Sequence, residues 1–258
     1  MSLPANEFRV LVLGGSGRIG TRVVQFLRAR GFLAEAASRS TGVDVLSGAG
    51  LIEAVAGQDV VVDLTRPALT GLESVGDFFT TAARNMLAAE AAAGVGHHII
   101  LSIVGCDRVE PGGYLNTKFA LEQEVRSGAV PFTILRATQF FEFLPAIADM
   151  ATTDGRVTLP EVLLQPLAAD DVALAVTTAA VADPLNDVSE VAGPECAPMV
   201  ELVGRVLRHR SDPREVTSDR SATYFGTRVE QTSLVPMGRV TMSSMTLDEW
   251  LRNQPRKL

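Results

Sequence analysis

The stretch VLVLGGSGRIG, residues 10–20, decides the fold of this chain. Its first part is a run of apolar residues that stops at glycine, which is typical of a buried parallel strand. Apolar residues at helical spacing follow the glycines. We therefore predict a strand over residues 8–13, a tight turn, and a helix over residues 20–29, which is the opening unit of a parallel α/β fold.

Two glycine patterns overlap in this turn. G-x-G-x-x-G uses Gly15, Gly17 and Gly20, and G-x-x-G-x-x-G uses Gly14 in place of Gly15. Such glycines permit a tight turn and the close approach of backbone to a diphosphate, while the following helix N-terminus attracts phosphate. The alternative is a purely structural turn. We predict a dinucleotide-binding loop whose contacts are Gly14, Gly15, Ser16, Gly17, Arg18 and Ile19.

Strand-like and helix-like segments alternate along the rest of the chain. We predict further strands at residues 33–37, 60–64, 98–104, 132–135 and 188–192, and helices at 51–56, 78–93, 115–126, 172–181 and 199–208. Asp170 and Asp171 are predicted to cap the helix that follows them. This alternation indicates an α/β fold of the Rossmann type, with a doubly wound parallel sheet and helices on both faces.

The alternation of strand-like and helix-like segments becomes less regular beyond about residue 143, which suggests how the chain is organised. We expect a single Rossmann-type domain with a core of about residues 1–143 plus 165–193. A small C-terminal substrate-binding annex is expected at about 144–164 and 194–258. Open α/β sheets bind ligands at the carboxyl ends of their strands, so we expect the annex to cover that edge.

Bulk composition excludes several classes of protein. The 258 residues are 47% hydrophobic and 21% charged, and apolar runs fall short of the roughly 18–20 residues that a membrane span needs. The start of the chain lacks the pattern of a signal peptide, so we expect a cytoplasmic protein with no membrane partner. The net charge of −7 argues against binding to nucleic acid.

Residues that often carry metal or redox chemistry show no such pattern here. The adjacent His97 and His98 would point to opposite faces of a strand, so no metal site is expected. Cys106 and Cys196 are predicted to be packed as small hydrophobic residues. A solvated helix end is the expected position of the arginines Arg205, Arg208, Arg210 and Arg214.

The residues at the end of the second predicted strand indicate which dinucleotide the protein binds. Enzymes that use NAD usually place an acidic residue there, whereas this chain has Ser38 and Arg39. Arg39, with Arg18, would pair with a 2′-phosphate, so NADP(H) is favoured over NAD(H). The alternative is that Arg39 is an ordinary surface residue. We also expect cofactor contacts from Asp44 near the adenine and from Leu64 and Thr65 near the ribose.

A second constellation follows the fourth strand. Tyr114 and Lys118 are four residues apart and would share one face of a helix, and Ser102 lies twelve residues before Tyr114. The chain has only two tyrosines, so a chance pairing is less expected than in a tyrosine-rich protein. An unremarkable helical pair is the alternative. Ser102 lies at the carboxyl end of this strand and Tyr114 and Lys118 follow it, and this arrangement favours a proton-transfer site.

The chain resembles the short-chain dehydrogenase/reductase superfamily, and within it the atypical NmrA-like branch. The residues that carry this resemblance are the glycine loop, Ser102, Tyr114-x-x-x-Lys118 and the stretches 135–140 and 165–173. The resemblance covers most of the chain. It implies that Tyr114 is a proton donor or acceptor, that Lys118 binds the ribose and assists Tyr114, and that Ser102 orients the substrate oxygen. Some NmrA-like proteins lack the tyrosine and act as redox-sensing regulators, whereas this chain retains it.

The Tyr–Lys pair is also reasonable chemically. A phenol with a pKa of about 10 relays protons poorly at neutral pH. One ammonium at about 4 Å supplies about 4 kcal/mol at an effective dielectric of about 20, which is roughly what a shift of three pKa units needs.

The residues after the fifth strand are expected to face the nicotinamide and the substrate, with Thr138 on the cofactor and Gln139, Phe140 and Phe143 on the substrate.

The leading hypothesis is an NADP(H)-dependent oxidoreductase acting on a small carbonyl compound or alcohol. A non-catalytic NADP(H)-binding sensor and an epimerase or dehydratase that uses the nucleotide transiently are the alternatives. Asn85 is predicted either to support the site or simply to pack in its helix, and the segment 224–226 to close the substrate pocket. Substrate identity and oligomeric state do not follow from the sequence.

Overall fold

The apolar run near the start of the chain forms strand β1 (Arg9–Leu13), and four of its five residues are buried. The structure, a computed structural model, describes residues 5–67, 75–238 and 240–254. β1 pairs in parallel with β2 (Leu33–Ala37) on one side and with β3 (Val60–Asp63) on the other. β3 is buried along its whole length, whereas β2 at the sheet edge is mostly exposed, as expected for a strand covered on one face.

Seven strands form the main sheet in the order β12-β9-β5-β4-β3-β1-β2. The remaining four strands are β4 (His97–Ile103), β5 (Phe132–Ala137), β9 (Asp187–Ala192) and β12 (Val240–Met242). The strand order reverses between β1 and β3, and open α/β sheets bind ligands at such a reversal, beyond the carboxyl ends of the strands. The predicted parallel α/β fold of the Rossmann type is confirmed.

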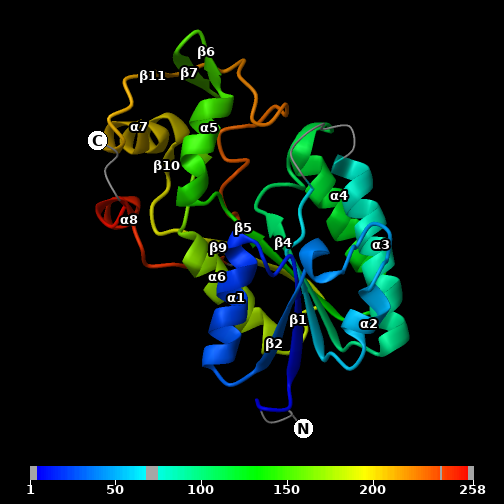
Figure 1. Ribbon diagram of the computed structural model, residues 1–258. Helices are drawn as coiled ribbons and strands as arrows, with labels where there is room; N and C mark the ends of the chain where they lie inside the picture. The colour runs from blue at the N-terminus through cyan, green and yellow to red at the C-terminus, as the bar shows by residue number, and fades with distance from the viewer. Residues whose placement is uncertain (1–4, 68–74, 239, 255–258) are drawn as a thin grey trace. The chain divides into compact units, whose positions relative to one another are not determined.

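Helices flank this sheet. In Figure 1, α1 and α6 lie on one side of the first strands, and α3 and α4 lie on the other. The helices are α1 (Arg18–Ala29), α2 (Leu51–Val55), α3 (Val75–Ala93), α4 (Gly113–Ser127), α5 (Leu144–Met150), α6 (Ala169–Ala180), α7 (Met199–His209) and α8 (Leu247–Arg252), with short 3₁₀ helices η1 (Arg39–Thr41) and η3 (Phe141–Phe143). Because α1 buries one apolar stripe that includes Val23 and Leu27, it packs on the sheet and presents its polar residues to solvent.

The chain divides into two compact units. Unit 1 consists of Met1–Ser102, Thr117–Arg136 and Val172–Ser189, and unit 2 of Ile103–Asn116, Ala137–Asp171 and Glu190–Leu258. Unit 1 holds the glycine loop and the first strands of the sheet. Unit 2 holds two smaller sheets, formed by β6 (Thr152–Thr153), β7 (Arg156–Leu159) and β11 (Glu215–Ser218) and by β8 (Leu163–Leu164) with β10 (Ala197–Pro198). The core and annex boundaries expected from the sequence stay a prediction.

The two adjacent histidines make separate buried contacts in unit 1. His97 Nε2 lies 2.8 Å from the Thr133 hydroxyl, and His98 Nδ1 lies 2.8 Å from a carboxylate oxygen of Glu90. Burial opposes charge on His98, but the Glu90 carboxylate outweighs it, so the pKa of His98 is raised. For Glu90, burial is the main cause of a raised pKa, because it disfavours the charged carboxylate. The His98–Glu90 contact joins β4 to α3, and the His97–Thr133 contact joins β4 to β5.

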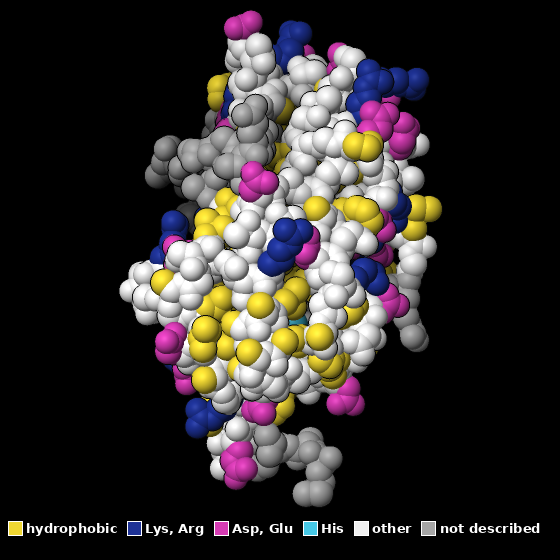
Figure 2. Space-filling model, turned by 90° about the vertical axis from the view of Figure 1, so that its right-hand side faces the viewer, with side chains coloured by type: hydrophobic (Ala, Val, Ile, Leu, Met, Phe, Trp, Pro, Cys, Tyr) yellow, Lys and Arg dark blue, Asp and Glu magenta, His cyan; other side chains and the backbone are white. Residues whose placement is uncertain are grey.

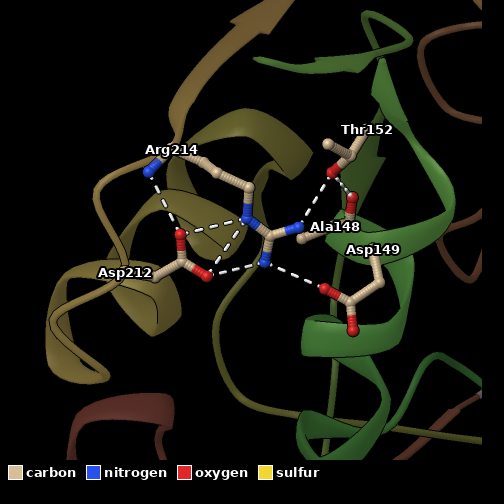
Figure 3. A network of polar contacts seen from close by, with 5 residues as sticks. All are labelled: Ala148, Asp149, Thr152, Asp212 and Arg214. Carbon is tan, nitrogen blue, oxygen red and sulfur yellow. Dashed lines mark hydrogen bonds and ion pairs between the residues drawn. The ribbon is translucent and has the colours of Figure 1, made fainter. Parts of the chain in front are cut away.

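The expectation of a solvated arginine cluster was wrong for two of its members, which are partly buried in ion pairs of unit 2. The Arg205 side chain is 16% exposed and pairs with Glu195 and Asp248. Figure 3 shows the guanidinium of Arg214 enclosed by Asp212, Asp149 and the Thr152 hydroxyl. Asp248 is 43 positions from Arg205 and Asp149 is 65 positions from Arg214, so helical spacing alone did not reveal these partners.

Two further local predictions were also wrong. Helix α6 begins at Ala169, so Asp170 and Asp171 lie in its first turn instead of capping it. The Ala169 N–H donates instead to the Glu142 carboxylate at 3.0 Å, so that a side chain from η3 satisfies the helix end. Cys196 is exposed, whereas Cys106 is buried as expected.

The surface is mixed in character. On the face that carries α3 and α4, Figure 2 shows hydrophobic side chains gathered over the lower half with charged ones around them. Arg84 of α3 pairs with Glu124 of α4 on this exposed side at 2.6 Å. Within the described part of the chain, no helix combines the length and hydrophobicity needed to cross a membrane.

Candidate functional site

Three glycines of the loop after β1 are required by the packing of the chain itself. Gly14 has a φ of +73°, and a Cβ there would lie 2.6 Å from the Leu64 carbonyl oxygen. A Cβ on Gly15 would meet Ala36 at 2.6 Å, and one on Gly20 would meet the Gly14 oxygen at 2.4 Å. Any larger residue would therefore push the first turn of α1 away from the ends of the strands.

Gly17 is different, because the protein leaves space around it. It is exposed, has a φ of −78° that any residue can adopt, and begins α1 as its N-cap. Among the described residues, a Cβ at Gly17 would meet only the Gly14 oxygen, at 3.2 Å. The absence of a side chain at this position therefore suits a group that approaches the backbone from outside.

The N-terminus of α1 offers that group a positive environment. Among the described residues no side chain caps this helix end, and the first turn contains no acidic residue. The first N–H groups of a helix have no intrahelical acceptor and carry a partial positive charge. An exposed glycine followed by such amides fits a diphosphate, so the residues present in the loop are compatible with a dinucleotide.

The ends of β2 and β3 flank the loop within unit 1. The Gly14 and Gly15 N–H groups donate to the Ala37 oxygen at 2.9 and 3.3 Å, which places Ser38 and Arg39 next to the loop. On the other side, the Leu64 N–H donates to the Leu13 oxygen at 3.0 Å. The structure thus brings together the predicted phosphate, 2′-phosphate and ribose contacts.

Arg39 begins η1 and extends into solvent beside the loop. Ser38 caps this short helix: its N–H donates to the Thr41 hydroxyl at 2.9 Å, and its own hydroxyl lies 2.8 Å from that of Ser40. Residues 38–41 contain no carboxylate, and Arg18 is exposed on the first turn of α1. Arg39, Ser40 and Thr41 are thus exposed just after β2, and Ser38 is half-exposed.

Asp44 lies in a loop that Asn85 holds in place. The Asp44 carboxylate accepts the Leu46 N–H at 2.9 Å, so it is engaged in a local turn. From α3, the Asn85 amide donates to the Val45 and Leu46 oxygens at 3.0 and 2.8 Å. Asn85 therefore binds the loop at residues 45–46, and its support of the site stays a prediction.

Ser102 is buried in a polar network that the sequence did not reveal. The Ser102 hydroxyl donates to the Glu122 carboxylate at 2.5 Å, and the Arg136 guanidinium donates to both oxygens of that carboxylate at 2.9 and 2.7 Å. All three side chains are at most 8% exposed. Two charged residues in otherwise apolar surroundings, one in β5 and one four residues after Lys118, were the available signal.

Lys118 and Tyr114 occupy the same face of α4, one turn apart. Lys118 is 6% exposed, and its ammonium lies 4.5 Å from the centre of the Phe79 ring of α3. The electron-rich face of an aromatic ring attracts a cation, and a charge removed from water acts strongly on neighbouring groups. Tyr114 is half-buried and belongs to unit 2.

The predicted residues after β5 lie in unit 2. The Thr138 hydroxyl donates to the Gln165 oxygen at 2.6 Å, and Phe140 bridges in parallel to Leu167. Gln139 is 6% exposed, and within the described residues neither of its amide atoms makes a hydrogen bond of regular geometry. Thr138 and Phe140 thus join β5 to the segment 165–167.

Comparison with known proteins agrees with this geometry. A family model described as NAD(P)H-binding matches residues 14–184. No curated protein matches the chain at a significant level. Several hundred solved structures do match it.

Some of these solved structures were determined with a bound dinucleotide. A short-chain dehydrogenase/reductase superfamily protein from Agrobacterium tumefaciens with bound NAD has 18% identity, covers 95% of each chain and has a TM-score of 0.71. UDP-glucose 4-epimerase from Thermus thermophilus in complex with NAD has 19% identity over 89% of this chain and 90% of its own, with a TM-score of 0.67. An NADPH-dependent quinone oxidoreductase from Escherichia coli complexed with NADPH has 20% identity over 81% and 77%, with a TM-score of 0.60. At these identities the similarity shows a shared fold.

Proposed function

The chain belongs to the NAD(P)H-binding family, and from that premise we propose that it is an NADP(H)-dependent oxidoreductase that interconverts a small carbonyl compound and its alcohol. The observation that carries the proposal is the loop around Gly17. Its backbone is open to an external group, it precedes an uncapped helix, and Arg39 lies beside it. We further propose that the chain is part of the NmrA-like branch of the short-chain dehydrogenase/reductase superfamily.

Each part of the cofactor has candidate contacts. The amides of residues 14–19 would hold the diphosphate, and Arg39 with Arg18 would pair with a 2′-phosphate. Ser38 and the loop at Asp44 would border the adenine end, while Leu64 and Thr65 would border the ribose. Thr138 and Lys118 are the contacts proposed for the nicotinamide half.

The chemistry of the chain's own residues supports a proton transfer. Bound NADPH supplies the hydride that reduces a carbonyl carbon. Tyr114 breaks its phenolic O–H bond and gives that proton to the carbonyl oxygen, which becomes the hydroxyl of the alcohol. The ammonium of Lys118 favours the resulting phenolate by charge, and solvent returns the proton to Tyr114.

Ser102 assists from the end of β4, through the helix that carries Tyr114 and Lys118. Its hydroxyl donates a hydrogen bond to Glu122, four residues after Lys118, and so joins β4 to α4. Gln139, Phe140 and Phe143 are proposed to contact the substrate. Two of these are half-exposed aromatic residues, which favours a small apolar molecule.

Reduction of a panel of aldehydes and ketones, followed at the nicotinamide absorbance, tests this function. Tyr114→Phe is expected to lower kcat by about 100-fold or more, because it removes the proton donor. The dissociation constant for NADPH should stay within about twofold of the original, since the phenyl ring remains. Unchanged turnover in Tyr114→Phe would remove Tyr114 from the mechanism.

The same panel separates the alternative functions. Tight NADPH binding with no turnover of any compound would favour a redox sensor. Turnover of a nucleotide sugar without net change in NADPH would favour an epimerase.

A further inference from the structure

The only two tyrosines of the chain, 110 positions apart in the sequence, both lie against one phenylalanine of unit 2. The Phe225 ring is 4.5 Å from the Tyr224 ring, edge to face, and 6.5 Å from the Tyr114 ring. It also stacks on Phe143, with 5.8 Å between the ring centres and 16° between the planes. The proposed proton donor thus stands in an aromatic cluster centred on Phe225.

Phe225 is carried by a turn that does not favour it. The Tyr224 N–H donates to the Thr227 oxygen at 2.8 Å and the Thr227 N–H to the Tyr224 oxygen at 3.0 Å, so Phe225 and Gly226 form a two-residue hairpin turn. Both central residues are left-handed, with φ of +50° and +77°. Such turns prefer Asn-Gly, and a bulky residue is strained at the first position. Local backbone preference therefore does not account for the phenyl ring.

The turn is fixed against the start of the helix that carries Tyr114. The Thr227 hydroxyl donates to the Gly112 oxygen at 2.8 Å. A Cβ on Gly113 would lie 2.2 Å from that hydroxyl and 2.7 Å from the Phe225 oxygen, so only glycine permits this approach. The position of the Phe225 ring is therefore set relative to the residue next to Gly113, which is Tyr114.

The cluster has a buried polar side and a half-exposed apolar side. Tyr224 and Gln139 are each 6% exposed, and the Gln139 amide lies beside the Tyr224 hydroxyl. Burial raises the pKa of Tyr224, so this phenol gives up its proton less readily than an exposed phenol does. Tyr114, Phe143 and Phe225 are half-exposed. An apolar aromatic surface therefore adjoins the phenol that transfers the proton.

We infer that Phe225, held on the turn at residues 224–227, is a specificity-determining residue that together with Phe143 selects carbonyl compounds bearing a flat apolar ring. Aromatic rings bind such groups through burial and offset or edge-to-face contact, whereas a polyhydroxylated compound would lose hydration without gaining partners. The inference rests on the proposed function, because it takes Tyr114 as the proton donor.

Phe225→Asn tests it with little risk to folding, because asparagine is the residue that this turn position prefers. With acetophenone as substrate we expect KM to rise by about tenfold or more, and with butanone to change by less than about twofold. The kcat at saturation should stay within about threefold for both, since Tyr114 and Lys118 are untouched. Phe225→Trp keeps an aromatic ring at this position, so its KM for acetophenone should stay close to that of the original protein.

Two further measurements make each outcome decisive. Thermal unfolding should show Phe225→Asn as stable as the original protein or more so, and a large loss would mark the ring as core packing and overturn the inference. Equal changes in KM for both ketones, or a collapse of kcat for both, would do the same by showing that Phe225 only positions Tyr114.

Calorimetric titration of acetophenone into the protein without NADPH separates this inference from the proposed function. If acetophenone binds the original protein and Phe225→Asn weakens that binding by about tenfold, the specificity surface stands even when no ketone is reduced. If acetophenone does not bind the original protein, the substrate class is wrong, whatever the outcome for turnover.

Discussion

The hydroxyl of Ser102 lies 2.5 Å from the carboxylate of Glu122 and donates its proton to it, and both side chains are at most 2% exposed. The same carboxylate accepts two hydrogen bonds from Arg136. A serine hydroxyl has a single proton, so Ser102 cannot give this bond and donate to a substrate oxygen at the same time. We therefore assign Ser102 to positioning α4.

Ser102→Ala is expected to lower the free energy of unfolding by about 1–3 kcal/mol, because it deprives a buried carboxylate of a donor. Urea denaturation measures this loss, and Ser102→Thr, which retains the hydroxyl, should recover most of it. The kcat/KM for a reduced ketone should fall by less than about tenfold. If kcat/KM fell by about 100-fold without loss of stability, the result would indicate that Ser102 contacts the substrate oxygen.

Arg39→Asp is expected to weaken NADPH binding by about tenfold to 100-fold, because a charge-assisted bond is lost and a repulsion is created. The dissociation constant for NADH should change by less than about threefold. Titration of both dinucleotides measures the difference, with Arg30→Asp as the control, since Arg30 is also exposed but lies at the opposite end of α1. Equal losses for both dinucleotides would contradict the assignment of the 2′-phosphate site.

Stability should fall as the pH drops below neutrality, through His97. Burial and the neighbouring His98 lower the pKa of His97 from 6.5 to about 4. Between these values the unfolded chain binds a proton that the folded chain does not, so the folded state loses stability as the pH falls through this window. One pKa unit corresponds to about 1.4 kcal/mol, so the lowering from 6.5 to about 4 corresponds to a loss of roughly 3–3.5 kcal/mol once the pH has fallen through the whole window.

His97→Gln removes the titrating group and keeps a donor near Thr133, so it should lack this part of the pH dependence. Urea denaturation of both proteins at pH 7 and pH 4.5 isolates the difference, because the other ionisable groups are common to the two. The same loss in both proteins would show that His97 is not protonated on unfolding in this range.

Arg214→Met is expected to cost about 1–2 kcal/mol of folding stability, because the arginine is 22% exposed and joins Asp212, Asp149 and Thr152. Arg220→Met is the matched control, since Arg220 is 88% exposed and pairs only at the surface with Glu161. That change should stay within about 0.5 kcal/mol. Thermal or chemical denaturation compares the two variants, and equal effects would show that the buried network adds nothing.

Much of unit 1 could be predicted because its signals are local. β1 is a continuous apolar run, the glycines occupy fixed spacings, and an amphipathic helix follows, so three neighbouring pieces of sequence agree on one structure. Parallel pairing then brings Arg39 and Leu64 to the glycine loop. Helix α4 was equally predictable, and with it the shared face of Tyr114 and Lys118.

The sequence by itself determined the α/β fold, the position of the dinucleotide loop and the four-residue spacing of Tyr114 and Lys118, because each of these depends on residues within one or two turns of each other. Only the tertiary structure showed which side chains Ser102 and Phe225 contact. Glu122 is 20 positions from Ser102, and Phe225 is 111 positions from Tyr114. Contacts at such separations are selected by packing and by the need to satisfy buried polar groups, and neither leaves a periodic pattern in the chain.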